Sequence, residues 1–268
     1  MTAGLGAADG AQMRLGERPV YPSLAAKRVF VTGGGSGIGA AIVEAFVRQG
    51  STVAFVDIAD EPSVALVNRL RDSGPGRIWY RHCDVAAVPM LQQAIADAAR
   101  ELGDFHVLVN NVASDERHVL HEVTPEYWDQ RMAINQRPAF FAIQAVVPGM
   151  RRLGGGSIVN LGSAGWQTKS AGYPAYATAK SSVNGLTRGL ARELGALRIR
   201  INVASPGWVM TERQLAMLDP ASEADLMHSQ CLPDKVWPDD IAAMVLFLAS
   251  DQARAITAQE FLVDAGWY

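Results

Sequence analysis

Short apolar runs rich in β-branched residues alternate with longer segments of helical spacing along the 268 residues of this chain. Runs such as RVFVT and TVAFVD, with polar residues or glycine after them, are typical of buried strands. The segment AAIVEAFVRQG instead carries Ile42, Val43, Phe46 and Val47 at the spacing of one helix face. The pattern predicts strands at 28–32, 52–57, 77–84, 106–111, 154–163, 199–207 and 260–266. It predicts helices at 40–50, 61–71, 90–102, 125–150, 174–194 and 238–249.

The alternation of strand and helix predicts an α/β fold. Strands that are apolar along their whole length indicate a parallel sheet covered by helices on both faces. Right-handed crossovers then give a doubly wound Rossmann fold with a seven-stranded parallel sheet. Between 211 and 236 the rhythm breaks, and this mixed segment with prolines at 220 and 233 predicts a small helical insertion over a binding cleft. We expect a single domain at 25–268 after a loose tail at 1–24.

Composition narrows the class of protein. The chain has 24 basic and 27 acidic residues and no basic tract, so we expect no nucleic-acid partner and no binding to an anionic membrane. No apolar run reaches the ~18 residues of a membrane span, and the first twenty residues lack the apolar core of a signal peptide. Cys83 and Cys231 are too few for a disulfide framework and are not spaced as metal ligands. We therefore expect a cytoplasmic protein without a metal site.

A glycine turn at 32–39, TGGGSGIG, lies between the first predicted strand and the first predicted helix. That context suits a dinucleotide, because glycines let the backbone approach a pyrophosphate at a helix N-terminus. Asp57, at the end of the second strand, is placed to bind the adenosine ribose hydroxyls and to repel a 2′-phosphate, which predicts NAD rather than NADP. Asp84 and Val85 are placed to meet the adenine. Each feature also has a simpler interpretation. Glycine turns of this kind occur without a ligand, and each aspartate could serve only in a turn or as a helix cap.

Tyr176 and Lys180 are four residues apart within a predicted helix, so their side chains share one face. An ammonium beside a phenol makes the phenolic proton easier to lose, as a catalytic acid/base tyrosine requires. A pair at this spacing is also common on solvated helices. The two residues therefore gain significance only from what surrounds them.

Seven features in one order resemble those of the short-chain dehydrogenase/reductase family. They are the glycine turn at 32–39, Asn110-Asn111, Asn135, Ser163, Tyr176, Lys180 and Pro206-Gly207. Each is modest alone, but their joint occurrence at family-like separations, from about residue 25 onward, is specific. One departure is Val112-Ala113 where the family usually has Ala-Gly, which puts the placement or the affinity of the cofactor in doubt.

The resemblance implies a catalytic tetrad of Asn135, Ser163, Tyr176 and Lys180. Tyr176 would be the general base in oxidation, Ser163 would hydrogen-bond the reacting oxygen, and Asn135 would hold a water that links Lys180 to solvent. An unperturbed tyrosine titrates near ~10, so Lys180 and the positive nicotinamide would have to favour tyrosinate. The resemblance also implies NAD contacts from Gly33, Ser36, Gly37, Ile38, Gly39, Asp57, Ile58, Asp84, Val85, Asn111, Val112, Ala113, Tyr176, Lys180, Pro206, Gly207, Val209 and Thr211.

The loops after the fourth, fifth and sixth strands are expected to form the substrate pocket. They offer Asp115, Glu116, Arg117, His118, Ser163, Gly165, Trp166, Gln167 and Trp208. Polar groups mixed with indole faces suit a polyhydroxylated ligand. Stretches such as VDIADE, SDERH and the ending DAGWY are similar to the aldose 1-dehydrogenase branch of the family, which oxidises the anomeric hydroxyl of an aldopyranose to an aldonolactone. Two alternatives stay open: the SDERH loop could be a solvated surface turn, and Trp166 and Trp208 could pack between subunits.

Two other enzyme functions and one non-enzymatic function remain open at this stage. The same scaffold serves reductases of 3-oxoacyl thioesters and dehydrogenases of polyols. A non-catalytic dinucleotide-binding protein is the alternative from another class, although the intact Tyr176/Lys180 pair argues against it. The family resemblance further implies a homotetramer, formed through the long helices at 125–150 and 174–194 and the C-terminal segment.

Overall fold

A parallel sheet of seven strands forms the middle layer of the molecule. The computed structural model describes residues 19–71 and 76–268. The strands lie in the order β3-β2-β1-β4-β5-β6-β7, and every neighbouring pair is parallel. Their bounds are β1 Arg28–Thr32, β2 Thr52–Asp57, β3 Arg77–His82, β4 Val107–Asn110, β5 Gly156–Leu161, β6 Ile199–Pro206 and β7 Glu260–Val263. The predicted doubly wound sheet is confirmed.

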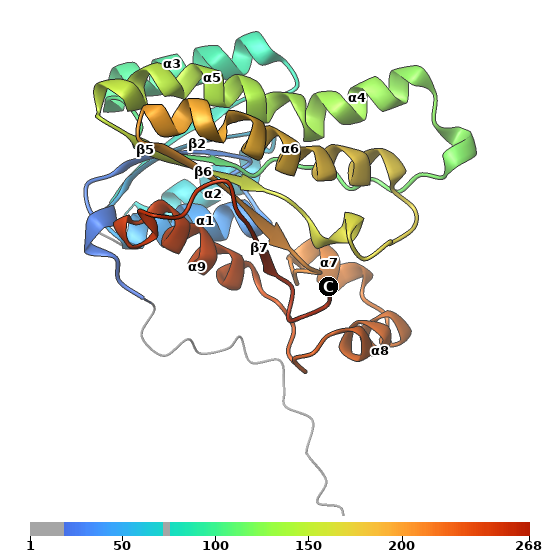
Figure 1. Ribbon diagram of the computed structural model, residues 1–268. Coiled ribbons are helices and arrows are strands. Elements are labelled where there is room, and N and C mark those ends of the chain that lie inside the picture. Colours follow the sequence, from blue (N-terminus) through green and yellow to red (C-terminus); the bar gives the residue numbers. More distant parts are fainter. Residues whose placement is uncertain (1–18, 72–75) are drawn as a thin grey trace, which may run out of the picture.

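Helices cover both faces of this sheet (Figure 1). α1, α2 and α9 lie on one face, and α3, α5 and α6 lie on the other. The α-helices are α1 Gly37–Arg48, α2 Asp60–Leu70, α3 Val88–Leu102, α4 Pro125–Asn135, α5 Arg137–Arg152, α6 Pro174–Ala196, α7 Glu212–Met217, α8 Pro220–Ser229 and α9 Pro238–Ala249. Short 3-10 turns are η1 Pro22–Leu24, η2 Leu120–Glu122, η3 Ala164–Trp166 and η4 Asp251–Ala253. No helix within the described ranges has the length and apolar character of a membrane span.

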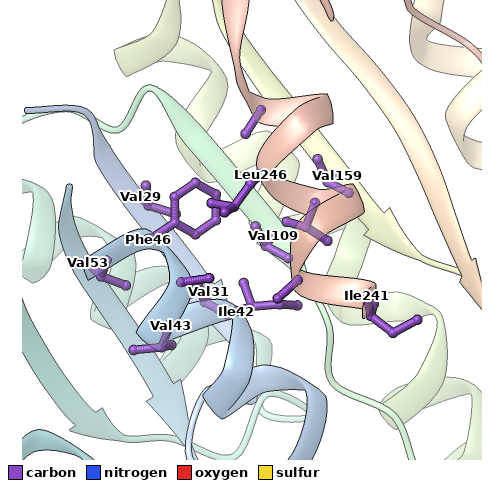
Figure 2. Packing of buried hydrophobic residues seen from close by; sticks show 14 of the residues in the cluster. Val29, Val31, Ile42, Val43, Phe46, Val53, Val109, Val159, Ile241 and Leu246 are labelled. Carbon is purple, nitrogen blue, oxygen red and sulfur yellow. The ribbon is translucent and has the colours of Figure 1, made fainter. Parts of the chain in front are cut away.

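The two helical layers enclose two hydrophobic cores, one on each face. Successive residues of a strand point to opposite faces, so Val29 and Val31 of β1 enter one core while Phe30 enters the other. Figure 2 shows the first core, where Phe46 of α1 and Leu246 of α9 pack with the two valines of β1. These side chains are shielded from water, and burial of apolar surface of this kind is the main stabilising contribution to such a fold.

The carboxyl ends of the central strands meet at one edge of the sheet. Thr32 of β1 is in register with Asn110 of β4, and Asn110 with Asn160 of β5. Since β1 lies between β2 and β4, the strand order reverses there, which opens the crevice in which such sheets bind ligands. The glycine turn, the loop after β4 and the loop after β5 therefore share one side of the molecule.

The predicted single helix at 125–150 is wrong. The structure has two helices, α4 and α5, which are separated by Gln136 with φ −125° and ψ −56°. Pro138 has no N–H to donate to the preceding turn, whereas the second position of a new helix needs no such donor. The chain therefore breaks the first helix and restarts the second with Pro138 in its first turn.

Two other predictions concern the start of the domain and the insertion. Residues 1–18 of the predicted tail at 1–24 lie outside the described residues. The rest of that segment includes η1, whose Leu24 is fully buried and accepts a hydrogen bond from Ser51 Oγ at 2.8 Å, so the folded part begins before residue 25. The insertion at 211–236 contains the short helices α7 and α8, as predicted, and both lie together at the edge of the molecule (Figure 1).

Candidate active site

A cavity of about 1190 Å³ opens at the carboxyl ends of the central strands. Its floor consists of the glycine turn and the segments after β2, β3, β4, β5 and β6, which is where the sequence placed a cofactor and a substrate. Residues of α7 and α8 and Trp267 also line it. All the predicted cofactor contacts line this cavity: Gly33, Ser36, Gly37, Ile38, Gly39, Asp57, Ile58, Asp84, Val85, Asn111, Val112, Ala113, Tyr176, Lys180, Pro206, Gly207, Val209 and Thr211.

The glycine turn brings two backbone segments into a contact that no side chain would permit. A Cβ placed on Gly39 would lie 1.8 Å from the Gly33 carbonyl oxygen, and Gly33 itself has φ +68°. α1 starts within this turn, at Gly37, and Ser36 at its N-cap makes no side-chain capping hydrogen bond with any described residue. The first amides of α1 thus border the cavity, in an arrangement that fits the pyrophosphate of a dinucleotide.

Asp57 both hydrogen-bonds the glycine turn and borders the cavity. One carboxylate oxygen accepts a hydrogen bond from the Gly35 amide at 2.8 Å, and the other accepts one from the Ala59 amide at 2.9 Å. The carboxylate still borders the cavity beside the exposed Ile58. Asp84 has a similar double position, because its Oδ1 accepts from the Ala86 amide at 2.9 Å while the residue also borders the cavity.

Asn111 ties the end of β4 to the glycine turn. Its Nδ2 donates to the Gly33 carbonyl at 2.8 Å, and its backbone amide donates to Thr32 Oγ1 at 3.0 Å. The next residue, Val112, packs over the same turn, since a Cβ on Gly33 would lie only 2.8 Å from Val112 Cγ2. The valine thus fills the space above Gly33.

Tyr176, Ser163 and Lys180 all line the cavity. Burial raises the pKa of Tyr176 to about 12, and its hydrogen bond with Ser163 acts in the opposite direction. Burial also lowers the pKa of Lys180 to about 8. The Lys180 ammonium donates to the Leu161 carbonyl at 2.7 Å and lies 6.0 Å from the centre of the Tyr176 ring. The helical spacing therefore does place both groups on one face.

Asn135 is buried behind the loop that follows β4. Its Oδ1 accepts from the Ser114 amide at 2.7 Å, and its Nδ2 donates to the carbonyls of Ser114 and Arg131 at 3.2 and 3.0 Å. It is not among the described residues that border the cavity. Its side chain is thus engaged in holding the loop.

The predicted substrate residues fall into two groups. Asp115, Arg117, Ser163, Gly165 and Trp208 border the cavity. Glu116, His118, Trp166 and Gln167 do not, and this part of the prediction is not supported by the geometry. Glu116 pairs with Arg131 at 2.9 Å, and Gln167 Nε2 donates to Glu260 at 3.4 Å. A loop of consecutive residues cannot direct every side chain to one side, and sequence alone does not say which side each takes.

Several cavity residues were not predicted. They include Thr168, Ser170 and Tyr173 before and at the start of α6, Arg213, Gln214, Asp225 and Leu226 in the insertion, and Trp267. Asp115 accepts from Arg213 at 2.5 Å and from Gln214 at 3.5 Å, so the loop after β4 touches α7 across the cavity. The polar residues after Thr211 were a usable signal for α7. No signal in the sequence indicated a place for Trp267 at the cavity. The nearby Ala265 carbonyl accepts hydrogen bonds from the amides of residues 231 and 232, which are distant in the sequence.

Comparison with known proteins assigns the family. A family model described as enoyl-(acyl carrier protein) reductase matches residues 33–268. The chain belongs to the short-chain dehydrogenase/reductase family, so the resemblance noted in the sequence is confirmed, and the protein is an NAD(P)-dependent dehydrogenase that acts on CH–OH groups.

The chain is similar to several individual relatives over most of its length. The chain is 47% identical to a D-xylose 1-dehydrogenase of Caulobacter vibrioides over 248 residues, which are 92% of this chain and 98% of the relative. It is 45% identical to a probable galactose dehydrogenase of Rhizobium meliloti over 247 residues, 92% of this chain and 96% of that protein. A solved structure of a blue fluorescent protein from a metagenomic library, in complex with NADPH, has a TM-score of 0.85 and 37% identity and covers 91% of this chain and 99% of its own.

Replacing the buried Lys180 tests its lowered pKa through stability. Between about pH 8, the pKa of Lys180 in the folded chain, and pH 10.5, its usual pKa, the unfolded chain carries a proton at this position that the folded chain lacks. Lys180 therefore makes the free energy of unfolding rise with pH in that window. Lys180→Met removes this dependence. The free energy of unfolding of Lys180→Met, relative to that of the wild type, should fall by on the order of 3 kcal/mol between pH 7 and pH 10, as measured from thermal midpoints.

Lys169→Met, at an exposed lysine, is the matched control and should show no such trend. The hydrogen bond to Leu161 adds a nearly constant offset, because a neutral amine also donates. A Lys180→Met difference that stays the same from pH 7 to pH 10 would contradict the assignment.

Proposed function

We propose that this protein oxidises the anomeric hydroxyl of an aldopyranose sugar to an aldonolactone, with NAD as hydride acceptor. The observation that carries the proposal is the 47% identity, along nearly the whole chain, to a D-xylose 1-dehydrogenase. The cavity lining supports it, because it combines carboxylate, guanidinium and hydroxyl groups with the Trp208 indole. Polar groups of this kind satisfy sugar hydroxyls, and an indole covers C–H faces.

We assign roles to the chain's own residues as part of this proposal. When bound, NAD supplies a ring that takes up the hydride and a positive charge next to Tyr176. Tyr176 Oη takes the proton of the sugar hydroxyl, and Ser163 Oγ hydrogen-bonds the same oxygen. Because burial raises the pKa of Tyr176 to about 12, tyrosinate needs positive charge close by, which protonated Lys180 contributes.

Asn135 completes the proposed tetrad by an indirect route. With Oδ1 and Nδ2 both engaged by the loop after β4, its side chain fixes that loop beside Tyr176. The proposed water between this region and Lys180 would be the path by which the proton returns to solvent. The glycine turn, Asp57 and Asn111 would hold the dinucleotide along the other half of the cavity.

A panel of substrates tests the function. Purified protein with NAD should reduce the cofactor in the presence of D-xylose, L-arabinose or D-galactose, and the product should be the corresponding lactone. Tyr176→Phe should lower turnover by roughly 10²- to 10⁴-fold while NAD binding is kept, because only the acid/base group is removed. Activity on polyols or 3-oxoacyl thioesters but on no aldose would overturn the proposal. NAD binding without turnover on any alcohol would favour the non-catalytic alternative.

Asp57 is the residue on which we base the proposed preference for NAD. A carboxylate at this place binds ribose hydroxyls and repels a 2′-phosphate. Asp57→Asn keeps the shape and removes the charge, and it should raise kcat/KM for NADP relative to NAD by about tenfold, the effect of ~1.4 kcal/mol at one contact. Equal wild-type efficiency with both cofactors would refute the preference, and Asp84→Asn serves as the control at the adenine end.

We further propose a homotetramer in the cytoplasm. Trp128 of α4, Phe140 of α5 and Leu120 of η2 are 37%, 42% and 83% exposed and are candidates for burial between subunits. Both cysteines are free thiols, as is usual for a reducing compartment. Light scattering during size exclusion should give about four times the 28.7 kDa of one chain, and Trp128→Glu should lower this mass. A monomer mass at micromolar concentration would contradict the tetramer.

A further inference from the structure

The segment 116–118 is joined to the segment 171–175 at the start of α6 by four contacts. The His118 amide donates to the Gly172 carbonyl at 2.9 Å, and Arg117 donates to the Ala171 carbonyl at 3.2 Å. The Arg117 guanidinium also lies 4.3 Å from the centre of the Tyr173 ring. The fourth contact is a hydrogen bond from the Ala175 amide to His118 Nε2 at 3.1 Å. The loop after β4 therefore holds the beginning of the helix that carries Tyr176.

The hydrogen bonds of His118 determine which ring nitrogen carries the proton. A backbone amide can only donate, so Nε2 must accept from Ala175. Nδ1 lies 2.9 Å from the Glu116 carbonyl, which can only accept, so Nδ1 carries the proton. The ring is only 7% exposed and packs edge-on against Tyr127 at 5.0 Å between centroids. Its position is therefore fixed on both nitrogens and by packing.

The start of α6 needs a hydrogen-bond acceptor from elsewhere in the chain. Tyr173 occupies the N-cap and makes no side-chain capping hydrogen bond within the described chain, and Pro174 has no N–H. Ala175 thus carries the first amide of the helix, one residue before Tyr176. Since unpaired amides at a helix start are normally satisfied by a capping side chain, His118 does here what a local Ser or Asp does elsewhere.

The other end of the same loop is bound to α4. Asn135 makes two hydrogen bonds with the Ser114 backbone, and Arg131, which is 4% exposed, donates to Ser114 Oγ at 3.2 Å and to Glu116 at 2.9 Å. Residues 114–118 thus connect Asn135 to the helix start at Ala175. A displacement at His118 would move the first turn of α6 relative to Ser163, which belongs to a different element.

We propose that His118 is a positioning residue that sets the place of the Tyr176 hydroxyl by capping α6 from the loop after β4, without touching the substrate. The inference rests on the proposed function only in that Tyr176 is the base. It corrects the expectation that His118 binds the sugar. It also assigns different tasks within one loop, because Asp115 and Arg117 border the cavity while His118 supports the catalytic helix.

The test compares His118→Leu with His118→Gln. Leucine fills the space but accepts no hydrogen bond, whereas the glutamine amide oxygen reaches about as far as Nε2 and can accept from Ala175. His118→Leu should lower kcat for the preferred aldose by roughly tenfold to a hundredfold, because a small displacement of a reacting group has such effects. His118→Gln should recover most of this loss. The KM for NAD should change little in either variant, because His118 lies outside the cavity.

Two measurements separate positioning from loss of folded protein. The primary deuterium isotope effect on kcat, with deuterium at C1 of the sugar, should rise in His118→Leu because the chemical step becomes slower. Hydrogen exchange at the Ala175 amide should become at least about tenfold faster in His118→Leu and return toward the wild-type rate in His118→Gln. His121→Leu is the matched control, at an exposed histidine in η2, and should behave as the wild type.

The outcomes distinguish this inference from the proposed function. If the wild type oxidises no aldose, the proposed function fails, and the exchange of the Ala175 amide still tests the cap. If the wild type is active and His118→Leu retains kcat within about twofold, the inference fails alone. An equal loss in the leucine and glutamine variants, or a fall in kcat with no change in isotope effect and amide exchange, would likewise overturn it.

Discussion

The site depends on the contact between two backbone segments in the turn after β1. At Gly39 the helix approaches the Gly33 carbonyl so closely that any side chain would collide with it. This contact brings the start of α1 directly over the sheet, and Asn111 holds the Gly33 carbonyl from the neighbouring strand. One hydrogen-bonded unit therefore joins β1, α1 and the loop after β4 at this part of the cavity.

Burial has opposite effects on the two groups at the chemical end. It raises the pKa of Tyr176 to about 12 and lowers that of Lys180 to about 8, and in both cases it favours the neutral form. A tyrosinate and an ammonium that form together stabilise each other in the same low-dielectric space. The bare protein thus opposes the charged pair, and the positive charge of an oxidised nicotinamide would shift the balance toward it. This arrangement would couple activation of the base to occupancy of the cofactor site.

Features with local causes could be predicted from the sequence, and features with distant causes could not. Strands, the glycine turn and the Tyr176/Lys180 spacing all follow from short patterns. The break before α5 has a local cause in Pro138, yet Pro148 lies inside the same helix without ending it, so proline alone does not say where a helix stops. His118 was assigned to the substrate because of its loop, although its partner Ala175 is 57 residues away and only the fold brings them together.

One side of the cavity is lined by α7 and α8, which bury few of their residues against the rest of the fold. None of the six residues of α7, all within the described chain, is buried, and α8 buries only Leu226. In contrast, five of the six residues of β5, the strand that leads to Ser163, are buried. Changes in α7, α8 or Trp267 can therefore alter the shape of this end of the cavity without moving Tyr176 or Ser163. Relatives named for D-xylose and for galactose have nearly the same identity to this chain, as expected if a few such positions determine the sugar.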